Sequence, residues 1–184
     1  MLKKNTLIPL AIILGLIIVF GLATYFIVGQ NKKAVIDETR QIFTNQPGEA
    51  PYTDLAGNPI SLDQYLGKIL VVSSWASWSP FSQGELNMMA ELAVQYKGQE
   101  IAFLAINRKE TKEQAARYLQ TFTAFEGVVM ALDPRDYFYN AVGGYAMPEV
   151  LVYNKRGEIV NHFRGPAPKS EIVTSLDSLL STTD

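Results

Sequence analysis

The longest apolar segment of the chain runs from Leu7 to Val28 and contains no charged residue. As a helix that rises about 1.5 Å per residue, it would measure roughly 33 Å, enough to cross the hydrocarbon core of a bilayer. A cleaved signal peptide is the alternative, but its apolar region normally has about 7–15 residues followed by a small-x-small cleavage site. No such site follows here. The pattern therefore predicts an N-terminal tail over residues 1–6 and an uncleaved transmembrane helix over residues 7–28, in contact with membrane lipid.

The remainder of the chain divides into a linker and a domain. Residues 29–50 contain the turn-forming sequence Asn45–Gly48 and are predicted to link the membrane helix to the domain. Residues 51–184 alternate strand and helix patterns. Two continuous apolar runs, Ile69–Val72 and Ile101–Ile106, are typical of strands that are covered on both faces of a sheet.

Helices and hairpins are predicted around these two strands. A helix over Pro80–Tyr96 follows the first strand, with its proline in the first turn. Thr111 and Gln114 form a capping-box pattern that opens a helix reaching about Phe125. The remaining predicted elements are a hairpin over residues 52–61, a hairpin over residues 149–163 and a final helix capped by Ser170. This order predicts a mixed central sheet with helices on both faces.

Composition narrows the chemistry. The formal net charge is −2 and the sequence has no basic stripe, which argues against a nucleic-acid partner. The chain has no cysteine, and this excludes disulfides, thiol catalysis and thiolate metal sites. His162 is the single histidine, so a metal site built from several histidines is excluded as well. We therefore predict no metal, no cofactor and no nucleic-acid partner.

Four segments of the predicted domain follow one another in a recognisable order. They are an opening hairpin (Thr53–Leu62), a strand with a tryptophan-rich motif (Gly67–Ser82), a proline segment (Gly144–Val152) and a closing hairpin (Asn154–Gly165). Together they resemble the membrane-anchored thioredoxin-like redoxins, the extracytoplasmic thiol–disulfide oxidoreductases that include cytochrome c maturation proteins. The resemblance implies an α/β, thioredoxin-like fold with an N-terminal hairpin, preceded by one transmembrane helix. It also implies a single-pass protein of the cell membrane whose soluble domain is extracytoplasmic.

Two serines stand where this family places the cysteines of a W-C-x-x-C motif. The segment reads Trp78-Ser79-Pro80-Phe81-Ser82, with Ser79 and Ser82 at the cysteine positions. Disulfide exchange needs a thiolate that attacks sulfur and a second thiol that resolves the mixed disulfide. A serine hydroxyl does neither. The chain as written is therefore predicted to have no catalytic residue and no dithiol activity.

The polar residues near the motif have structural explanations. Glu85 occupies the position of an acid that assists the thiols in many members of the family; without thiols, we expect a carboxylate stabilised by the helix macrodipole. A hydrolase with Ser79 as nucleophile would need an adjacent base. Since His162 lies in the closing hairpin, we expect Ser79 or Ser82 to cap the helix instead. His162 is assigned no function, and the charged residues within 108–112 are expected to form a solvated loop.

Pro148 marks the segment that is expected to bind a partner. The resemblance implies a cis Met147–Pro148 bond, with the backbone N–H and C=O of Met147 offered to an extended peptide. Trp78, Phe81, Tyr145 and Met147 are expected to form an apolar rim beside it. The alternative is that Pro148 only shapes its loop and that Trp78 is half-buried.

Three functions stay open at this point. The first, which we predict, is a redox-inactive, membrane-tethered binding module that holds an extended segment of an extracytoplasmic protein in the cis-proline groove. The second is a thiol–disulfide oxidoreductase of the cell envelope, seen as a Cys-to-Ser form. The third is a purely structural subunit of an envelope complex. The genomic codons at positions 79 and 82 would distinguish the first two.

Overall fold

The computed structural model describes residues 20–22, 24, 51–122 and 125–182. Residues 20–22 and 24 are helical, but none of the helices in the described ranges has the length and apolar character needed to cross a bilayer. The predicted N-terminal tail, the linker up to residue 50 and most of the predicted transmembrane helix lie outside the described residues.

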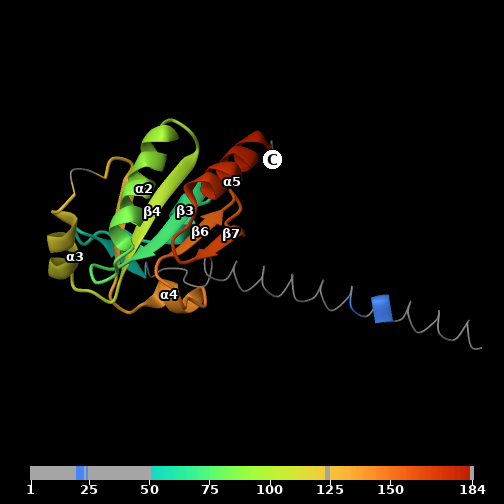
Figure 1. The fold of residues 1–184 in the computed structure, drawn as a ribbon. Helices are drawn as coiled ribbons and strands as arrows, with labels where there is room; N and C mark the ends of the chain where they lie inside the picture. The colour runs from blue at the N-terminus through green and yellow to red at the C-terminus, as the bar shows by residue number, and fades with distance from the viewer. Residues whose placement is uncertain (1–19, 23, 25–50, 123–124, 183–184) are drawn as a thin grey trace, which may run out of the picture. The chain divides into compact units, whose positions relative to one another are not determined.

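A seven-stranded mixed sheet forms the centre of the domain (Figure 1). The strands are β1 (Tyr52–Asp54), β2 (Pro59–Ile60), β3 (Ile69–Trp75), β4 (Ile101–Arg108), β5 (Val128–Asp133), β6 (Glu149–Tyr153) and β7 (Ile159–Arg164). They lie in the order β2-β1-β5-β4-β3-β6-β7. β3, β4 and β5 run parallel, whereas the other strands pair antiparallel with their neighbours. The predicted mixed sheet and N-terminal hairpin are thus confirmed.

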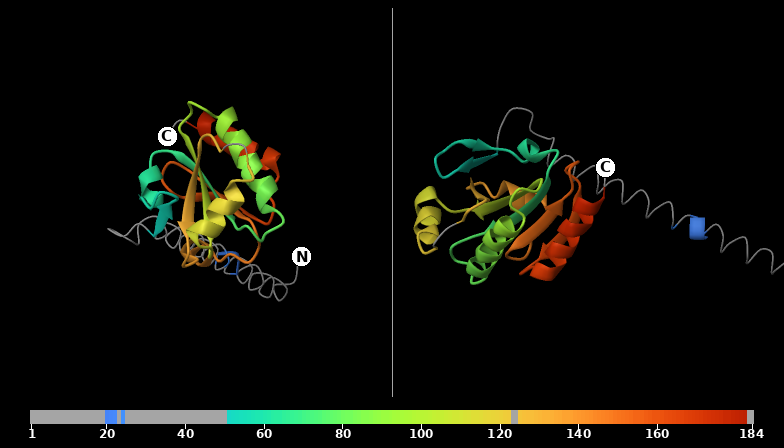
Figure 2. Two further views of the ribbon diagram at one scale, coloured as in Figure 1. Left: turned by 90° about the vertical axis from the view of Figure 1, so that its left-hand side faces the viewer. Right: turned by 90° about the horizontal axis from the view of Figure 1, so that it is seen from above.

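Helices cover both faces of this sheet, as predicted. They are α2 (Ser82–Gln95), α3 (Lys112–Leu119), α4 (Tyr137–Ala141), α5 (Lys169–Ser181) and the 3₁₀ helix η2 (Leu62–Tyr65). Side chains of α2, α3 and α5 share one hydrophobic cluster, and those of η2 and α4 share another. Figure 2 shows α2 and α5 side by side on the same face.

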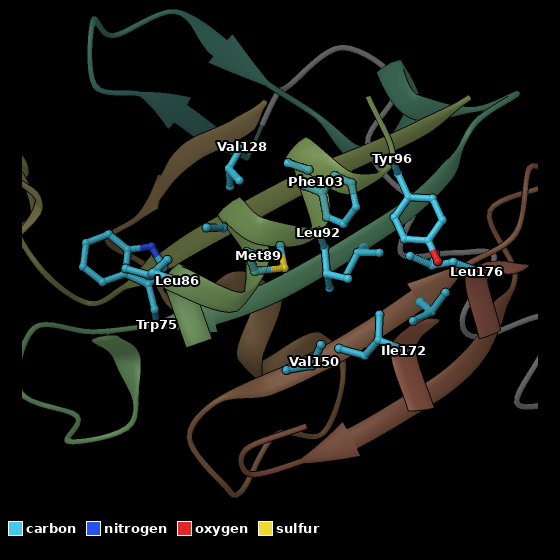
Figure 3. Close-up of a cluster of buried hydrophobic side chains, with 14 of the residues drawn as sticks. Trp75, Leu86, Met89, Leu92, Tyr96, Phe103, Val128, Val150, Ile172 and Leu176 are labelled. Carbon is cyan, nitrogen blue, oxygen red and sulfur yellow. The ribbon is translucent and has the colours of Figure 1, made fainter. Parts of the chain in front are cut away.

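The side chains of the central strand β3 pack into both hydrophobic clusters. All seven of its residues are buried. Since successive side chains of a strand point to opposite faces, Ile69 and Val71 join the cluster with α2 and α5, while Leu70 and Val72 join the cluster with α4. Figure 3 shows the first cluster, to which the helices contribute Leu86, Met89, Leu92, Ile172 and Leu176.

Two helices begin at residues other than those predicted. α2 begins at Ser82 rather than at Pro80, because the proline lies in a turn that precedes the helix. α5 begins at Lys169, directly after an extended Pro168 at the N-cap position. Ser170 therefore lies inside the first turn and does not cap α5, so that prediction is wrong.

The middle of the domain differs most from the sequence prediction. The capping box of Thr111 and Gln114 is confirmed, and both of its hydrogen bonds are present, but α3 ends at Leu119. The strand β5 and the short helix α4 had no counterpart in the predicted elements. β5 matters for the fold because it joins the N-terminal hairpin to β4.

Candidate functional site

The serine motif and the cis-proline lie on neighbouring strands. The motif follows the end of β3, and the proline precedes the start of β6. These strands are antiparallel neighbours, so the end of one lies beside the start of the other. The Met147–Pro148 bond is cis, as predicted. Ser74 joins the two segments, because its hydroxyl accepts a hydrogen bond from the Glu149 N–H at 2.8 Å and donates one to Met147 Sδ at 3.7 Å.

Both serines of the motif are buried and bonded to backbone. Ser79 is 4% exposed and Ser82 is 1% exposed. Ser82 Oγ accepts from the Ala76 N–H at 3.1 Å, and Ser79 Oγ accepts from the Phe81 N–H at 3.4 Å. The N-cap residue of α2 is Phe81, which has no side-chain capping bond. The prediction that a serine caps α2 is therefore wrong; the hydroxyls stabilise the turn that leads into the helix.

Neither serine has an activating base. His162 is the single histidine of the chain, and its Nε2 lies 2.6 Å from Glu149 Oε2. No carboxylate or imidazole of the described residues forms a hydrogen bond with Ser79 or Ser82. A serine hydroxyl without an adjacent base is a poor nucleophile, so the arrangement gives no support to a hydrolase.

Glu85 is a buried acid in the first turn of α2. Its side chain is 4% exposed, and its Oε1 has no hydrogen-bond partner among the residues described. Burial raises the pKa of this carboxyl from 4.5 to about 7, while the nearby Ser73 hydroxyl and Ala167 backbone lower the pKa only in part. In place of the expected carboxylate stabilised by the helix macrodipole, the structure has a desolvated acid, because burial is the largest effect on its pKa.

The aromatic residues of the predicted rim are strongly exposed. Trp78 is 61% exposed, Phe81 is 51% exposed and Tyr145 is 76% exposed. The alternative of a half-buried Trp78 is therefore wrong; the neighbouring Trp75 is the buried one, at 0%. These three exposed rings form no stacking contact with one another in the structure. Trp78 and Phe81 flank the serines, while Tyr145 flanks the proline loop.

The backbone groups of Met147 and Pro148 differ in their hydrogen bonding. No hydrogen bond links its N–H or C=O to any other described residue, whereas the C=O of the buried Pro148 accepts from the Gly165 N–H at 2.8 Å. We call Trp78, Phe81, Tyr145, Met147 and Pro148, the five residues that the sequence analysis expected to bind a partner, the docking surface. It combines exposed aromatic area with one free backbone donor and one free backbone acceptor.

Glu149, which the sequence analysis did not single out, holds the proline loop. The side chain is 0% exposed. Its Oε1 accepts from the N–H groups of Tyr145 at 2.8 Å and Ala146 at 2.9 Å, and its Oε2 contacts His162. His162 thus has a structural role after all, because β7 places it beside this carboxylate. The feature of the sequence that could have indicated this role is a charged residue at the start of an apolar strand.

Glu110 supports the other side of the site in the same way. It is 6% exposed and accepts hydrogen bonds from the Ser77 N–H at 2.9 Å, from Asn107 Nδ2 at 2.6 Å and from the Ser77 hydroxyl. It therefore fixes the loop just before Trp78. The prediction of a solvated loop is wrong for Glu110. It holds for the exposed Lys109, whereas the exposed Lys112 is the first residue of α3.

Arg108 also departs from that prediction. Its Nε and Nη2 lie 2.8 and 2.5 Å from the two carboxylate oxygens of Asp136, and its Cζ lies 3.3 Å from the Tyr139 ring centroid. Lys109 Nζ also lies 3.4 Å from Asp136 Oδ2, so Asp136 pairs with both basic residues.

Within the described ranges, no group of three or more acidic or histidine side chains is placed to hold a metal ion.

Comparison with known proteins relates the domain to one family. The model of the Redoxin family matches residues 44–180. The thiol-disulfide oxidoreductase ResA of Geobacillus kaustophilus is 29% identical over 127 residues, which cover 69% of this chain and 72% of the relative. The thiol:disulfide interchange protein HelX of Rhodobacter capsulatus is 29% identical over 136 residues, with 73% and 70% covered.

Solved structures show the same fold. A thiol:disulfide interchange protein of the thioredoxin family from Chlorobium tepidum has a TM-score of 0.58 and 22% identity, with 74% of this chain and 98% of that chain covered. The exposed lipoprotein thioredoxin of Streptococcus pneumoniae has a TM-score of 0.61 and 18% identity, with 69% and 96% covered. The resemblance seen in the sequence to thioredoxin-like redoxins is thereby confirmed.

Proposed function

Because the chain belongs to the Redoxin family, we propose that it is a membrane-tethered, redox-inactive binding module. In this proposal an extended segment of an extracytoplasmic protein binds to the docking surface. The observation that carries the proposal is the combination of serines at positions 79 and 82 with a free Met147 backbone beside the cis-proline.

The loss of redox function follows from the chemistry of oxygen. A thiol–disulfide oxidoreductase forms a mixed disulfide through one cysteine and releases the product through a second. With no cysteine anywhere in the chain, neither sulfur–sulfur bond can form. The hydroxyls of Ser79 and Ser82 are instead used to bind backbone N–H groups.

Docking by strand addition is the function that this surface supports best. An extended segment gains affinity from main-chain hydrogen bonds, and side-chain contacts give it specificity. Met147 offers the main-chain groups, and the exposed rings of Trp78, Phe81 and Tyr145 offer apolar contact area. The carboxylates of Glu149 and Glu110 hold the loops on the two sides, so little ordering entropy is lost on binding.

The tether is the predicted helix over residues 7–28. It would keep the domain at the extracytoplasmic face of the cell membrane. Protease protection of a C-terminal tag in intact and permeabilised cells tests this part. Cleavage of the tag only after permeabilisation of the cytoplasmic membrane would contradict it.

One assay on the full-length chain in mild detergent tests redox inactivity. Insulin reduction in the presence of dithiothreitol should proceed at the rate of the buffer blank. The double variant Ser79→Cys/Ser82→Cys is the positive control, since it restores a dithiol to the same helix start. A rate above blank for the unmodified chain would disprove the proposal.

Binding is tested separately with an array of cysteine-free decapeptides. The full-length chain should bind a subset of them, and Pro148→Ala should weaken binding because it changes the loop that carries Met147. The control Lys97→Gln changes an exposed residue beyond the far end of α2 and should bind like the unmodified chain. Binding that is the same for Pro148→Ala as for the unmodified chain would place the docking elsewhere.

A second candidate is an oxidoreductase of which this sequence is the Cys-to-Ser form. The observation that favours it is Glu85, an acid with its pKa near 7 that lies three residues beyond Ser82. Such an acid is suited to proton transfer at neutral pH. Cysteine codons at positions 79 and 82 of the genomic gene would establish this candidate; serine codons would eliminate it.

A further inference from the structure

We propose that the docking surface selects segments that carry a carboxylate side chain, and that the guanidinium of Arg164 binds this carboxylate. The inference rests on the proposed docking function and names the chemistry of its partner. It follows from the distribution of charge around the surface, from the contact between Arg164 and Tyr145, and from the register of β6 and β7.

The acidic residues around the docking surface face inwards. Glu85, Glu110 and Glu149 are 4%, 6% and 0% exposed, respectively. The carboxylates of Glu110 and Glu149 are already occupied by N–H and O–H donors and by His162. A docked segment would therefore meet little negative charge at the surface itself.

Basic residues near the docking surface differ in whether an acidic side chain neutralises them. Arg108 and Lys109 both pair with Asp136. Arg164, by contrast, is exposed and forms no ion pair with any residue in the described part of the chain. The charge that the surface offers to a partner is thus positive, and a carboxylate complements it.

Tyr145 orients the Arg164 side chain. The Arg164 Cζ lies 5.0 Å from the centroid of the Tyr145 ring, which is 76% exposed. A guanidinium that stacks on an aromatic ring keeps its N–H donors free at the edge, where they match the two oxygens of a carboxylate. The stacking therefore prepares the donors of Arg164 for a partner and reduces the entropy cost of binding.

The register places Arg164 within reach of a docked strand. Arg164 lies opposite Glu149 in the pairing of β7 with β6, and Glu149 is two residues beyond Met147. Consecutive Cα atoms lie at most about 3.8 Å apart, so the Cα atoms of Met147 and Glu149 are within about 7.6 Å of each other, a distance that an arginine side chain can bridge. We expect the acidic residue of the segment within two positions of the residue that pairs with Met147.

The test uses matched peptides and the full-length chain in mild detergent. The tightest cysteine-free decapeptide from the array is synthesised with glutamate at each position in turn and with glutamine at the same position. Fluorescence anisotropy of the labelled peptides gives affinity. Acrylamide quenching of tryptophan reports docking at Trp78, because the other tryptophan, Trp75, is buried.

We expect one or two glutamate peptides to bind about two- to fivefold more tightly than their glutamine partners at low salt, and the preference to shrink as salt rises. Arg164→Gln should remove the preference, so that each glutamate peptide binds no more tightly than its glutamine partner. Arg164→Lys should keep the sign of the preference, and the charge-matched control Lys97→Gln should keep all of it.

The outcomes separate the two proposals. Equal affinity of glutamate and glutamine peptides for the unmodified chain would overturn the role of Arg164 and leave docking intact. A preference that survives in Arg164→Gln would also overturn it. If no peptide binds and Trp78 stays equally accessible to acrylamide, the docking function fails and this inference fails with it.

Discussion

At the scale of single residues, buried carboxylates determine the shape of the site. Glu149 and Glu110 are each nearly inaccessible and each bonded to at least one backbone N–H of a loop on the docking surface. Backbone N–H groups of a tight loop cannot pair with one another, so a carboxylate that accepts two of them replaces the missing partner. The loops are thereby held without a ligand.

Removing the Glu149 side chain should loosen the proline loop. Glu149→Ala leaves the Tyr145 and Ala146 N–H groups without their acceptor, which should lower the free energy of unfolding by about 2–4 kcal/mol. Glu149→Gln keeps an acceptor oxygen and should cost less than half as much. Urea unfolding followed by circular dichroism measures both. Equal losses for the two variants would show that the charge, rather than the acceptor oxygen, holds the loop.

Gly144 should tolerate no side chain. A Cβ at this position would lie 2.7 Å from the ring of Tyr139, and Arg108 covers that ring. Gly144→Ala should therefore destabilise the fold by about 1–3 kcal/mol, because the ring or the loop must move. Gly84 of α2 has no atom within 4 Å of its missing Cβ, so Gly84→Ala should stabilise by up to about 1 kcal/mol. The melting temperatures of the two variants should shift in opposite directions; an unchanged or higher melting temperature for Gly144→Ala would contradict the packing at Gly144.

At the scale of elements, the sequence predicts the helices, strands and hairpins that depend on residues close together in the chain. The apolar runs of β3 and β4, the capping box of α3 and the hairpin of β6 and β7 are readable because each depends on neighbours in sequence. The contacts of Glu110 with Ser77 and of Ser74 with Glu149 join residues 33 and 75 positions apart. No periodicity shows them, and the burial of these polar residues becomes evident only when the strand order is known.

The start of α2 gives a prediction at this scale. Ser82 Oγ is the acceptor for the buried Ala76 N–H, so Ser82→Ala should cost about 1–3 kcal/mol of unfolding free energy. Ser79→Ala should cost less, because its bond to the Phe81 N–H is long at 3.4 Å. Thermal unfolding of the single variants measures the difference. A larger loss for Ser79→Ala would contradict the assignment of Ser82 as the main support of the turn.

At the scale of the whole molecule, the sheet gathers the site from three parts of the chain. β3 brings the serine motif, β4 brings Glu110 and β6 brings the cis-proline, because β3 lies between the other two strands. The cluster of α2 and α5 against the same strands buries Glu85 close to this junction. The burial that builds the core thus also determines the protonation of an acid at the site, and the stability of the whole domain should depend on it.

Glu85 should make the folded state less stable as pH rises. Its pKa is about 7 in the folded state and 4.5 as the ordinary value, so between these pH values the folded state holds a proton that the unfolded state has lost. The free energy of unfolding must then fall with increasing pH through this range and level off above about pH 7. A rise of the pKa from 4.5 to about 7 corresponds to about 3 kcal/mol. Relative to the unmodified chain, Glu85→Gln should therefore gain stability from about pH 4.5 upwards, because the amide has no proton to lose.

Urea unfolding at pH 4, 5.5, 7 and 8 measures this difference, in which other acids with shifted pKa values, such as Asp133, cancel. The control Glu126→Gln should behave in the opposite sense and weakly, since Lys97 lowers the pKa of that exposed carboxyl. If the difference between Glu85→Gln and the unmodified chain is the same at all four pH values, Glu85 is ionised in the folded state with an ordinary pKa. Its carboxylate would then have to be hydrated, and the junction of β3 with α2 would be open to water rather than packed.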